Sequence, residues 1–144
     1  MSAQLAPIIR KAEIDDLEAI FALLIDFAMS FKPERAAFDE SMRQLLADEA
    51  AWLAVAEVNG TVVGYCLGFD HFTFYANGRV SWVEEITVQR EMRRLGIGKA
   101  LMQHFEGWAN KRGSNLVALA TRRASTFYRA LGYEETALCF RKLL

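Results

Sequence analysis

This sequence of 144 residues has few of the residues that several specialised protein classes need. Its two histidines and two widely separated cysteines do not have the spacing of a zinc site, so we expect no metal. Its net charge of −1 provides no broad basic surface, which argues against nucleic-acid binding. No apolar run approaches the roughly 20 residues of a membrane span, and the first residues lack the pattern of a signal peptide. These absences predict a soluble cytoplasmic protein.

The two cysteines, Cys66 and Cys139, both lie in apolar runs typical of strands. A cysteine in such a run is usually a buried thiol. We therefore expect both side chains to be buried and unpaired, as in a reducing compartment.

The composition that remains is that of an ordinary globular protein, with 53% hydrophobic residues, and we expect residues 1–144 to form a single domain. Hydrophobic periodicity and turn residues predict the order β-α-α-β-β-β-α-β-α-β, which indicates a mixed α/β or α+β domain around one sheet. The predicted strands are residues 7–12, 52–58, 61–69, 80–88, 115–121 and 137–144. The predicted helices are residues 15–31, 38–51, 98–112 and 124–131.

Local signals refine three connections of this outline. Asn59-Gly60 between two apolar, β-branched runs predicts a tight hairpin, because both residues accept positive φ. Asp39 is a candidate N-cap for the second helix. Residues 71–78 are expected to form a loop or the end of a strand.

A glycine-rich, basic junction, "RRLGIGKA", joins a predicted strand to a predicted helix at residues 93–100. The first N–H groups of a helix have no partner within it, and the helix dipole adds positive charge there. Glycine lets an anion approach this backbone closely, and arginine and lysine suit phosphates. The junction therefore predicts a phosphate-binding site.

Two common glycine motifs do not fit this junction. A P-loop ending at Gly98-Lys99 would need glycine at Arg93 and Ser or Thr at Ala100. A dinucleotide fingerprint beginning at Gly96 would need a third glycine where the chain has Leu101. The remaining pattern is Arg-x-x-Gly-x-Gly.

The longer stretch "WVEEITVQREMRRLGIGKALM" resembles the pyrophosphate-binding motif of the GNAT superfamily of acyl-CoA N-acetyltransferases, and "ASTFYRALGYEE" resembles its second signature. The resemblance implies a mixed, mainly antiparallel sheet flanked by helices, acetyl-CoA as cosubstrate, and acetyl transfer to an amine. The cosubstrate-binding residues that it implies are Ile86, Thr87, Val88, Arg93, Arg94, Leu95, Gly96, Ile97, Gly98, Lys99, Ala100, Thr121 and Tyr128. One departure is Thr121, where many members have an asparagine that contacts the pantetheine arm.

Two adjacent glutamates in the strand at 80–88 are candidates for the general base. If the side chains alternate regularly, Glu84 lies in an apolar row, where burial raises a carboxyl pKa and suits it to accept a proton from an amine of pKa about 10. A bulge near this point would exchange the faces and favour Glu85 instead. The resemblance favours Glu84, because some polyamine-type members use a glutamate at its position.

The resemblance also assigns roles to Val88 and Tyr128. The Val88 N–H would face the thioester carbonyl and stabilise the negative charge that develops there. Tyr128 matches the tyrosine proposed to protonate the leaving thiolate, whose conjugate acid has a pKa near 8.5.

The acceptor pocket is expected between the first two helices and the aromatic loop at residues 69–78, where Asp70 lies among aromatic residues suited to a cationic amine. Residues 31–40 are candidates for a segment that closes on the substrate. We expect a small primary amine such as a polyamine, amino acid or amino sugar. Alternatives are a protein N-terminus or lysine, a non-catalytic acyl-CoA-binding module, and a nucleotide or phosphate-sugar site. A homodimer through the apolar last strand is a further possibility.

Overall fold

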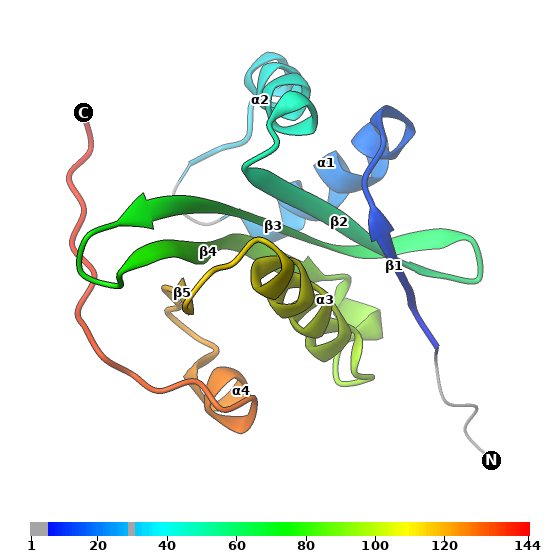
Figure 1. Ribbon diagram of the computed structural model, residues 1–144. Helices are drawn as coiled ribbons and strands as arrows, with labels where there is room; N and C mark the ends of the chain where they lie inside the picture. Colours follow the sequence, from blue (N-terminus) through cyan, green and yellow to red (C-terminus); the bar gives the residue numbers. More distant parts are fainter. Residues whose placement is uncertain (1–5, 29–30) are drawn as a thin grey trace.

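The computed structural model describes residues 6–28 and 31–144, and at its centre is a five-stranded sheet in the order β1-β2-β3-β4-β5 (Figure 1). Neighbouring strands from β1 to β4 are antiparallel, and β5 is parallel to β4. The strands are β1 (Ile8–Lys11), β2 (Ala51–Val58), β3 (Thr61–Thr73), β4 (Gly78–Val88) and β5 (Val117–Leu119). The expected mixed, mainly antiparallel α+β fold is confirmed.

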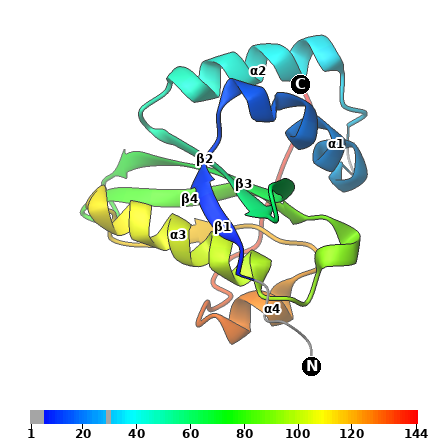
Figure 2. The same ribbon diagram turned by 90° about the vertical axis from the view of Figure 1, so that its right-hand side faces the viewer.

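Helices cover both faces of the sheet, α1 and α2 on one face and α3 and α4 on the other (Figure 2). They are α1 (Leu17–Phe27), α2 (Arg35–Ala47), α3 (Ile97–Lys111) and α4 (Ser125–Ala130), with short 3-10 turns at Ile14–Asp16 and Arg90–Met92. No helix in the described part of the chain has the length and apolar composition needed to cross a membrane.

The sheet separates two hydrophobic cores, because neighbouring residues of a strand point to opposite faces. Tyr65 belongs to the core under α1 and α2, together with Ile20 and Met42. Its neighbour Cys66 belongs to the core on the α3 face, together with Phe105. Side chains that are adjacent along a strand can therefore take part in different regions of the molecule, one on each face of the sheet.

The β2–β3 hairpin turns at Asn59 and Gly60, which both have positive φ, 52° and 80°. This is the backbone conformation that a two-residue turn of this type requires, and the predicted hairpin is confirmed.

A β-bulge interrupts β4 at Glu84. Leu67 of β3 is paired with Glu85, and the next residue, Gly68, is paired with Val83, so that Glu84 has no partner in β3. An extra residue shifts the alternation of side chains by one position. The regular alternation that placed Glu84 in an apolar row therefore does not hold across this strand.

The pairing between β4 and β5 is short. It covers only Ser81–Val83 of β4 and Val117–Leu119 of β5, whereas β4 continues to Val88. Beyond Val83, no described strand lies against this edge of β4. The sheet therefore opens where the predicted cosubstrate residues begin.

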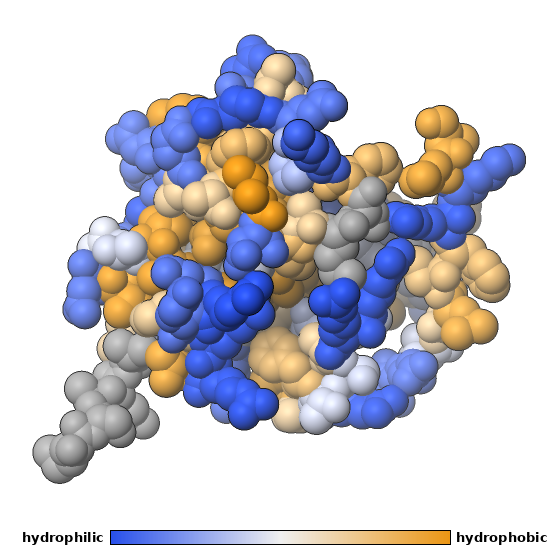
Figure 3. All heavy atoms as spheres, turned by 180° about the vertical axis from the view of Figure 1, so that it is seen from behind, coloured by the Kyte–Doolittle hydropathy of each residue, from blue (hydrophilic) through white to orange (hydrophobic). Residues whose placement is uncertain are grey.

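The prediction of a last strand at residues 137–144 is wrong. This segment has no strand pairing, and Leu138 and Phe140 are 81% and 87% exposed. Figure 1 shows the segment passing along one side of the molecule, and Figure 3 shows hydrophobic side chains standing out on that side. A strand needs a partner edge and a surface on which to bury its apolar side chains, and this segment has neither. Cys139 is exposed for the same reason, and only Cys66 is the expected buried thiol.

Two helix boundaries also differ from the predictions. The helix α2 begins at Arg35, with Glu34 rather than Asp39 as its N-cap. Asp39 lies within the helix and accepts a hydrogen bond of 2.7 Å from Arg35 Nε, an i, i+4 pair that stabilises the first turn. The helix α1 ends at Phe27, and part of the predicted remainder, residues 29–30, lies outside the described residues.

Candidate active site

The glycine junction connects β4 to α3, and its backbone is built to expose N–H groups. Gly96 is the N-cap of α3 with φ of 86°, a left-handed conformation that favours glycine. The first helical hydrogen bond is donated by Ala100 to the Gly96 carbonyl at 3.0 Å, so the N–H groups of residues 97–99 precede it. Because Gly96 has no side chain, the N-cap residue does not satisfy any of these N–H groups. These amides and the dipole of a 15-residue helix make the turn a candidate anion-binding site.

The residues around this turn fit a phosphate group. Arg94 has φ of 64°, a strained conformation for a non-glycine residue and one that is enriched at functional sites. Arg93, Arg94 and Lys99 are exposed, and Arg93 Nε donates a hydrogen bond of 3.0 Å to the Val88 carbonyl. A Cβ on Gly98 would lie 3.4 Å from the Phe127 ring, an ordinary van der Waals contact, so α4 lies close to the first turn of α3.

The open edge of β4 offers a second set of backbone groups. The Gln89 N–H donates to the Val63 carbonyl of β3 at 2.7 Å. In an antiparallel pair the N–H groups of successive residues point to alternate sides. The backbone N–H of Thr87 therefore points toward β3, and the N–H groups of Ile86 and Val88 point toward the edge that β5 leaves open. This edge can pair with an extended amide-containing group such as a pantetheine arm.

Tyr128 lies in α4 and belongs to the core on the α3 face, where Ile86 and Val88 also pack. Its ring is 7% exposed, and burial, with a smaller effect from Cys66, raises the pKa of Tyr128 to about 12. Tyr128 is therefore protonated throughout the neutral range.

The other predicted residues of this region lie around the same corner. Leu95 is exposed in the turn, whereas Ile97 is buried and anchors the first turn of α3. Thr121 is exposed, and its Oγ1 accepts a hydrogen bond of 3.1 Å from the Ala124 N–H just before α4. Thr121 thus stabilises the entry to the helix that carries Tyr128.

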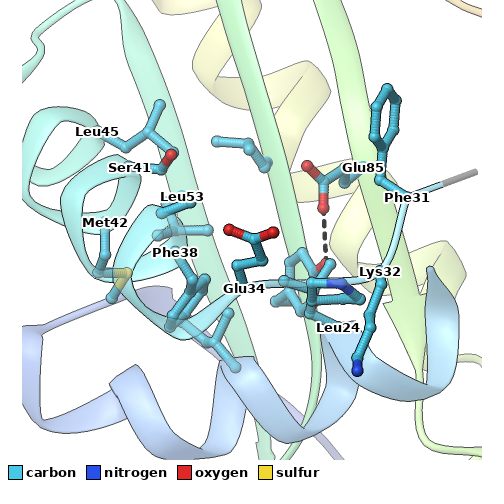
Figure 4. Close-up of a pocket in the computed structure, with 15 residues that line it drawn as sticks. Leu24, Phe31, Lys32, Glu34, Phe38, Ser41, Met42, Leu45, Leu53 and Glu85 are labelled. Atoms are coloured by element: carbon cyan, nitrogen blue, oxygen red, sulfur yellow. Dashed lines mark hydrogen bonds between the residues drawn. The ribbon is translucent and has the colours of Figure 1, made fainter.

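Glu85 lies on the opposite face of the sheet, in a pocket of about 380 Å³ between the sheet and α1 and α2 (Figure 4). Its Oε1 accepts a hydrogen bond of 2.8 Å from the Tyr65 hydroxyl. Burial raises the pKa of Glu85, the charge of Glu84 raises it further, and the hydrogen bond from Tyr65 opposes them. Glu84, at the bulge, is exposed and does not line this pocket.

The pocket forms only in part from the segments that the sequence indicated. Both α1 and α2 line it, and so does the segment leading into α2, but residues 69–78 do not. Asp70 is instead fully buried between Arg79 and Arg112, at 2.8 and 2.6 Å, because β3 continues to Thr73. A buried carboxylate already paired with two guanidinium groups is not available to bind an amine.

Sequence analysis missed the contribution of β2 and β3 to this pocket. Tyr65, Leu53 and Leu67 line it from these strands. The available signal was the hydroxyl of Tyr65 within an apolar strand, since a buried tyrosine hydroxyl needs a hydrogen-bond partner.

The site therefore combines a turn of unpaired helix N–H groups, an open strand edge and a carboxylate in a pocket, an arrangement that suits transfer of a group from a phosphate-containing cosubstrate. The model of the Acetyltransferase (GNAT) family matches residues 17–133, and the chain belongs to this family. It is an N-acetyltransferase with acetyl-CoA as cosubstrate.

One curated relative is likewise an N-acetyltransferase, and two solved structures share the fold. An aminoalkylphosphonate N-acetyltransferase of Salmonella typhimurium (strain LT2) is 27% identical over 140 residues, 94% of this chain and 90% of the relative. A structure described as a transcriptional regulator from Bacillus halodurans C-125 has a TM-score of 0.87 at 22% identity, with 96% of this chain and 100% of that chain covered. The aminoglycoside N-acetyltransferase AAC(6')-Iy, solved in complex with CoA, has a TM-score of 0.82 at 22% identity, with coverage of 99% and 98%.

Proposed function

We propose that this enzyme acetylates the primary amine of a small molecule, with Glu85 as general base and Tyr128 as general acid. The observation that carries the proposal is the position of Glu85, a carboxylate of raised pKa in a pocket next to the open edge of β4. Acetyl-CoA supplies the acetyl group as a thioester. The first turn of α3 holds its pyrophosphate, and Ile86 and Val88 pair with its pantetheine arm.

The two faces of the sheet would then bring the two reactants together from opposite sides. Glu85 faces the pocket under α1 and α2, whereas Tyr128 lies among the residues of the α3 face. The amine enters from the pocket, its nitrogen forms a bond to the acyl carbon, and the bond from that carbon to sulfur breaks. Glu85 takes the proton that the nitrogen loses, and the Val88 N–H stabilises negative charge on the carbonyl oxygen.

Tyr128 supplies a proton to the departing sulfur. A phenol of pKa about 12 is a weak acid, but the same surroundings raise the proton affinity of a thiolate. Burial raises the pKa of the nearby Cys66 thiol in the same direction.

A small-molecule acceptor is favoured by the small volume of the pocket. Its volume of about 380 Å³ is at the lower end of the range for small-molecule sites. The amines named for the relatives, aminoalkylphosphonates and aminoglycosides, are likewise small molecules. A protein N-terminus or lysine is the alternative acceptor.

The base is tested with a pair of adjacent variants, Glu85→Gln and Glu84→Gln, assayed by acetyl-CoA-dependent thiol release with an amine panel. Glu85→Gln should lose about 10²–10³-fold in kcat, because general base catalysis contributes this much. Its activity should recover as pH approaches about 10, where the amine itself becomes neutral. Glu84→Gln should stay within about threefold of the wild type. A larger loss in Glu84→Gln than in Glu85→Gln would assign the base to the bulge residue instead.

A further inference from the structure

The walls of the Glu85 pocket are mainly apolar, and its polar lining residues besides Glu85 and Tyr65 are Lys32, Glu34 and Ser41. Leu24 of α1, Phe38 and Leu45 of α2, and Leu53 and Leu67 of the sheet line it (Figure 4). We propose that the preferred acceptor is a primary amine with an apolar alkyl or arylalkyl body, and this inference rests on the function proposed above.

Burial of a hydrocarbon body against these walls removes apolar surface from water. Each methylene group buried in this way improves binding about fourfold. A hydroxyl buried against leucine has no hydrogen-bond partner and weakens binding. A polyhydroxylated amino sugar is therefore a poor match for the walls of this pocket.

The polar groups of the pocket are too few for a highly charged acceptor. In its depth, Glu85 is already hydrogen-bonded to Tyr65 through one oxygen, which leaves the other oxygen for a single amine. Glu34 and Lys32 are exposed at the mouth. Lys32 is the only cation among the described lining residues, and in Figure 4 its side chain extends away from Glu85. A phosphonate bound in the pocket would thus have no cationic partner beside it.

The charge at the mouth also opposes a polycation. Lys32 is the one cation among the described lining residues, and Glu34 and Glu85 are the carboxylates, so the lining carries at most one net negative charge. An acceptor with several ammonium groups gains little there, and burying any of them deeper costs desolvation. A single amine that binds Glu85, on an apolar body that packs against the walls, is the acceptor that matches this pocket.

The direct test is an acceptor series with acetyl-CoA and thiol release as readout. The series runs from ethylamine to hexylamine and includes 2-phenylethylamine, with glucosamine, 2-aminoethylphosphonate, spermidine and an aminoglycoside as polar comparisons. We expect kcat/KM to rise about three- to fourfold per methylene and to exceed that of every polar amine. Turnover of the polar amines with a flat alkyl series would overturn this inference and leave the proposed function intact. No turnover with any amine would overturn both.

Two neighbouring leucines provide a matched pair of variants. Leu45 lines the pocket, whereas Leu46 packs into the core beneath it, and both are half-buried. Leu45→Asn should lower kcat/KM for hexylamine about tenfold while changing that for ethylamine less than about twofold. Leu46→Asn should destabilise the fold and leave the ratio of the two amines unchanged. Leu45→Ala is the milder variant if Leu45→Asn does not fold, and an unchanged hexylamine-to-ethylamine ratio in it would contradict the proposal.

Discussion

The proposed phosphate-binding turn uses backbone groups, whereas the Glu85 pocket uses side chains. The turn consists of backbone N–H groups from consecutive residues at the start of α3, which precede the first helical hydrogen bond and follow the left-handed Gly96. The pocket consists of side chains from two helices and three strands, which lie far apart along the chain. The backbone of the turn suits a constant group, such as a pyrophosphate, because its amides do not change with side-chain substitution. The pocket instead allows the acceptor to change with single substitutions.

The bulge at Glu84 is where the two regions meet. It lies on β4 one residue before Glu85 and two residues before the open edge begins at Ile86. The extra residue turns Glu85 rather than Glu84 toward the pocket. The strand thereby presents a carboxylate on one face and the N–H groups of Ile86 and Val88 along the edge.

Apart from replacement of the general base Glu85, the largest expected loss of activity comes from replacing the general acid Tyr128. Tyr128→Phe should lower kcat about 100-fold with little change in the KM for acetyl-CoA, because it removes a proton donor and keeps the ring. Tyr133→Phe is the matched control, since that hydroxyl donates a 2.6 Å hydrogen bond to Glu106 instead. Steady-state kinetics of both variants measure the difference, and equal losses would remove Tyr128 from the chemistry.

A smaller effect is expected when the turn itself is changed. Gly96→Val should raise the Kd for CoA about tenfold, because a β-branched residue is strained at φ of 86° and the amides lose their alignment. Gly107→Ala, in the middle of the same helix with nothing within 4 Å of the added Cβ, should keep the Kd and raise stability by about 1 kcal/mol. Calorimetric titration with CoA and thermal unfolding measure these outcomes. An unchanged Kd in Gly96→Val would separate CoA binding from this turn.

The smallest effect concerns stability and its dependence on pH. The pKa of Glu85 is raised above its ordinary value of 4.5, so the folded chain holds a proton that the unfolded chain releases. This residue therefore makes the wild type lose stability as pH rises from 4.5 through the folded pKa, whereas Gln at this position does not titrate. The stability of Glu85→Gln relative to the wild type should rise across that window and then level off. Urea unfolding at several pH values measures it, and the opposite slope would mean that the folded protein favours the ionised carboxylate.

Local features were predictable from the sequence, and features that depend on distant partners were not. Asn59-Gly60 and Arg93–Gly98 carry their own backbone requirements, and both turns form where they were expected. The bulge depends on how Leu67 and Gly68 of β3 align with β4, which the sequence of β4 alone does not encode. Likewise, the apolar run at 137–144 has the pattern of a strand, but no edge of the sheet receives it.

The candidate site likewise has one part formed by residues close in sequence and another part formed by residues that are distant in sequence. Most of the predicted cosubstrate residues follow one another along β4 and the turn, so a local pattern was enough to propose them. The pocket side chains come from five elements, and only the fold brings Tyr65 to Glu85. Asp70 shows the converse, because its aromatic neighbours suggested an amine site and the fold instead pairs it with Arg79 and Arg112.

A crystal structure of the enzyme with CoA and an acceptor amine bound would test the central claim most directly. The account predicts the pyrophosphate on the N–H groups of residues 97–99 and the amine nitrogen within hydrogen-bond distance of Glu85 in the pocket under α1 and α2. A pyrophosphate bound away from the start of α3, or an amine held by Glu84 outside that pocket, would contradict it.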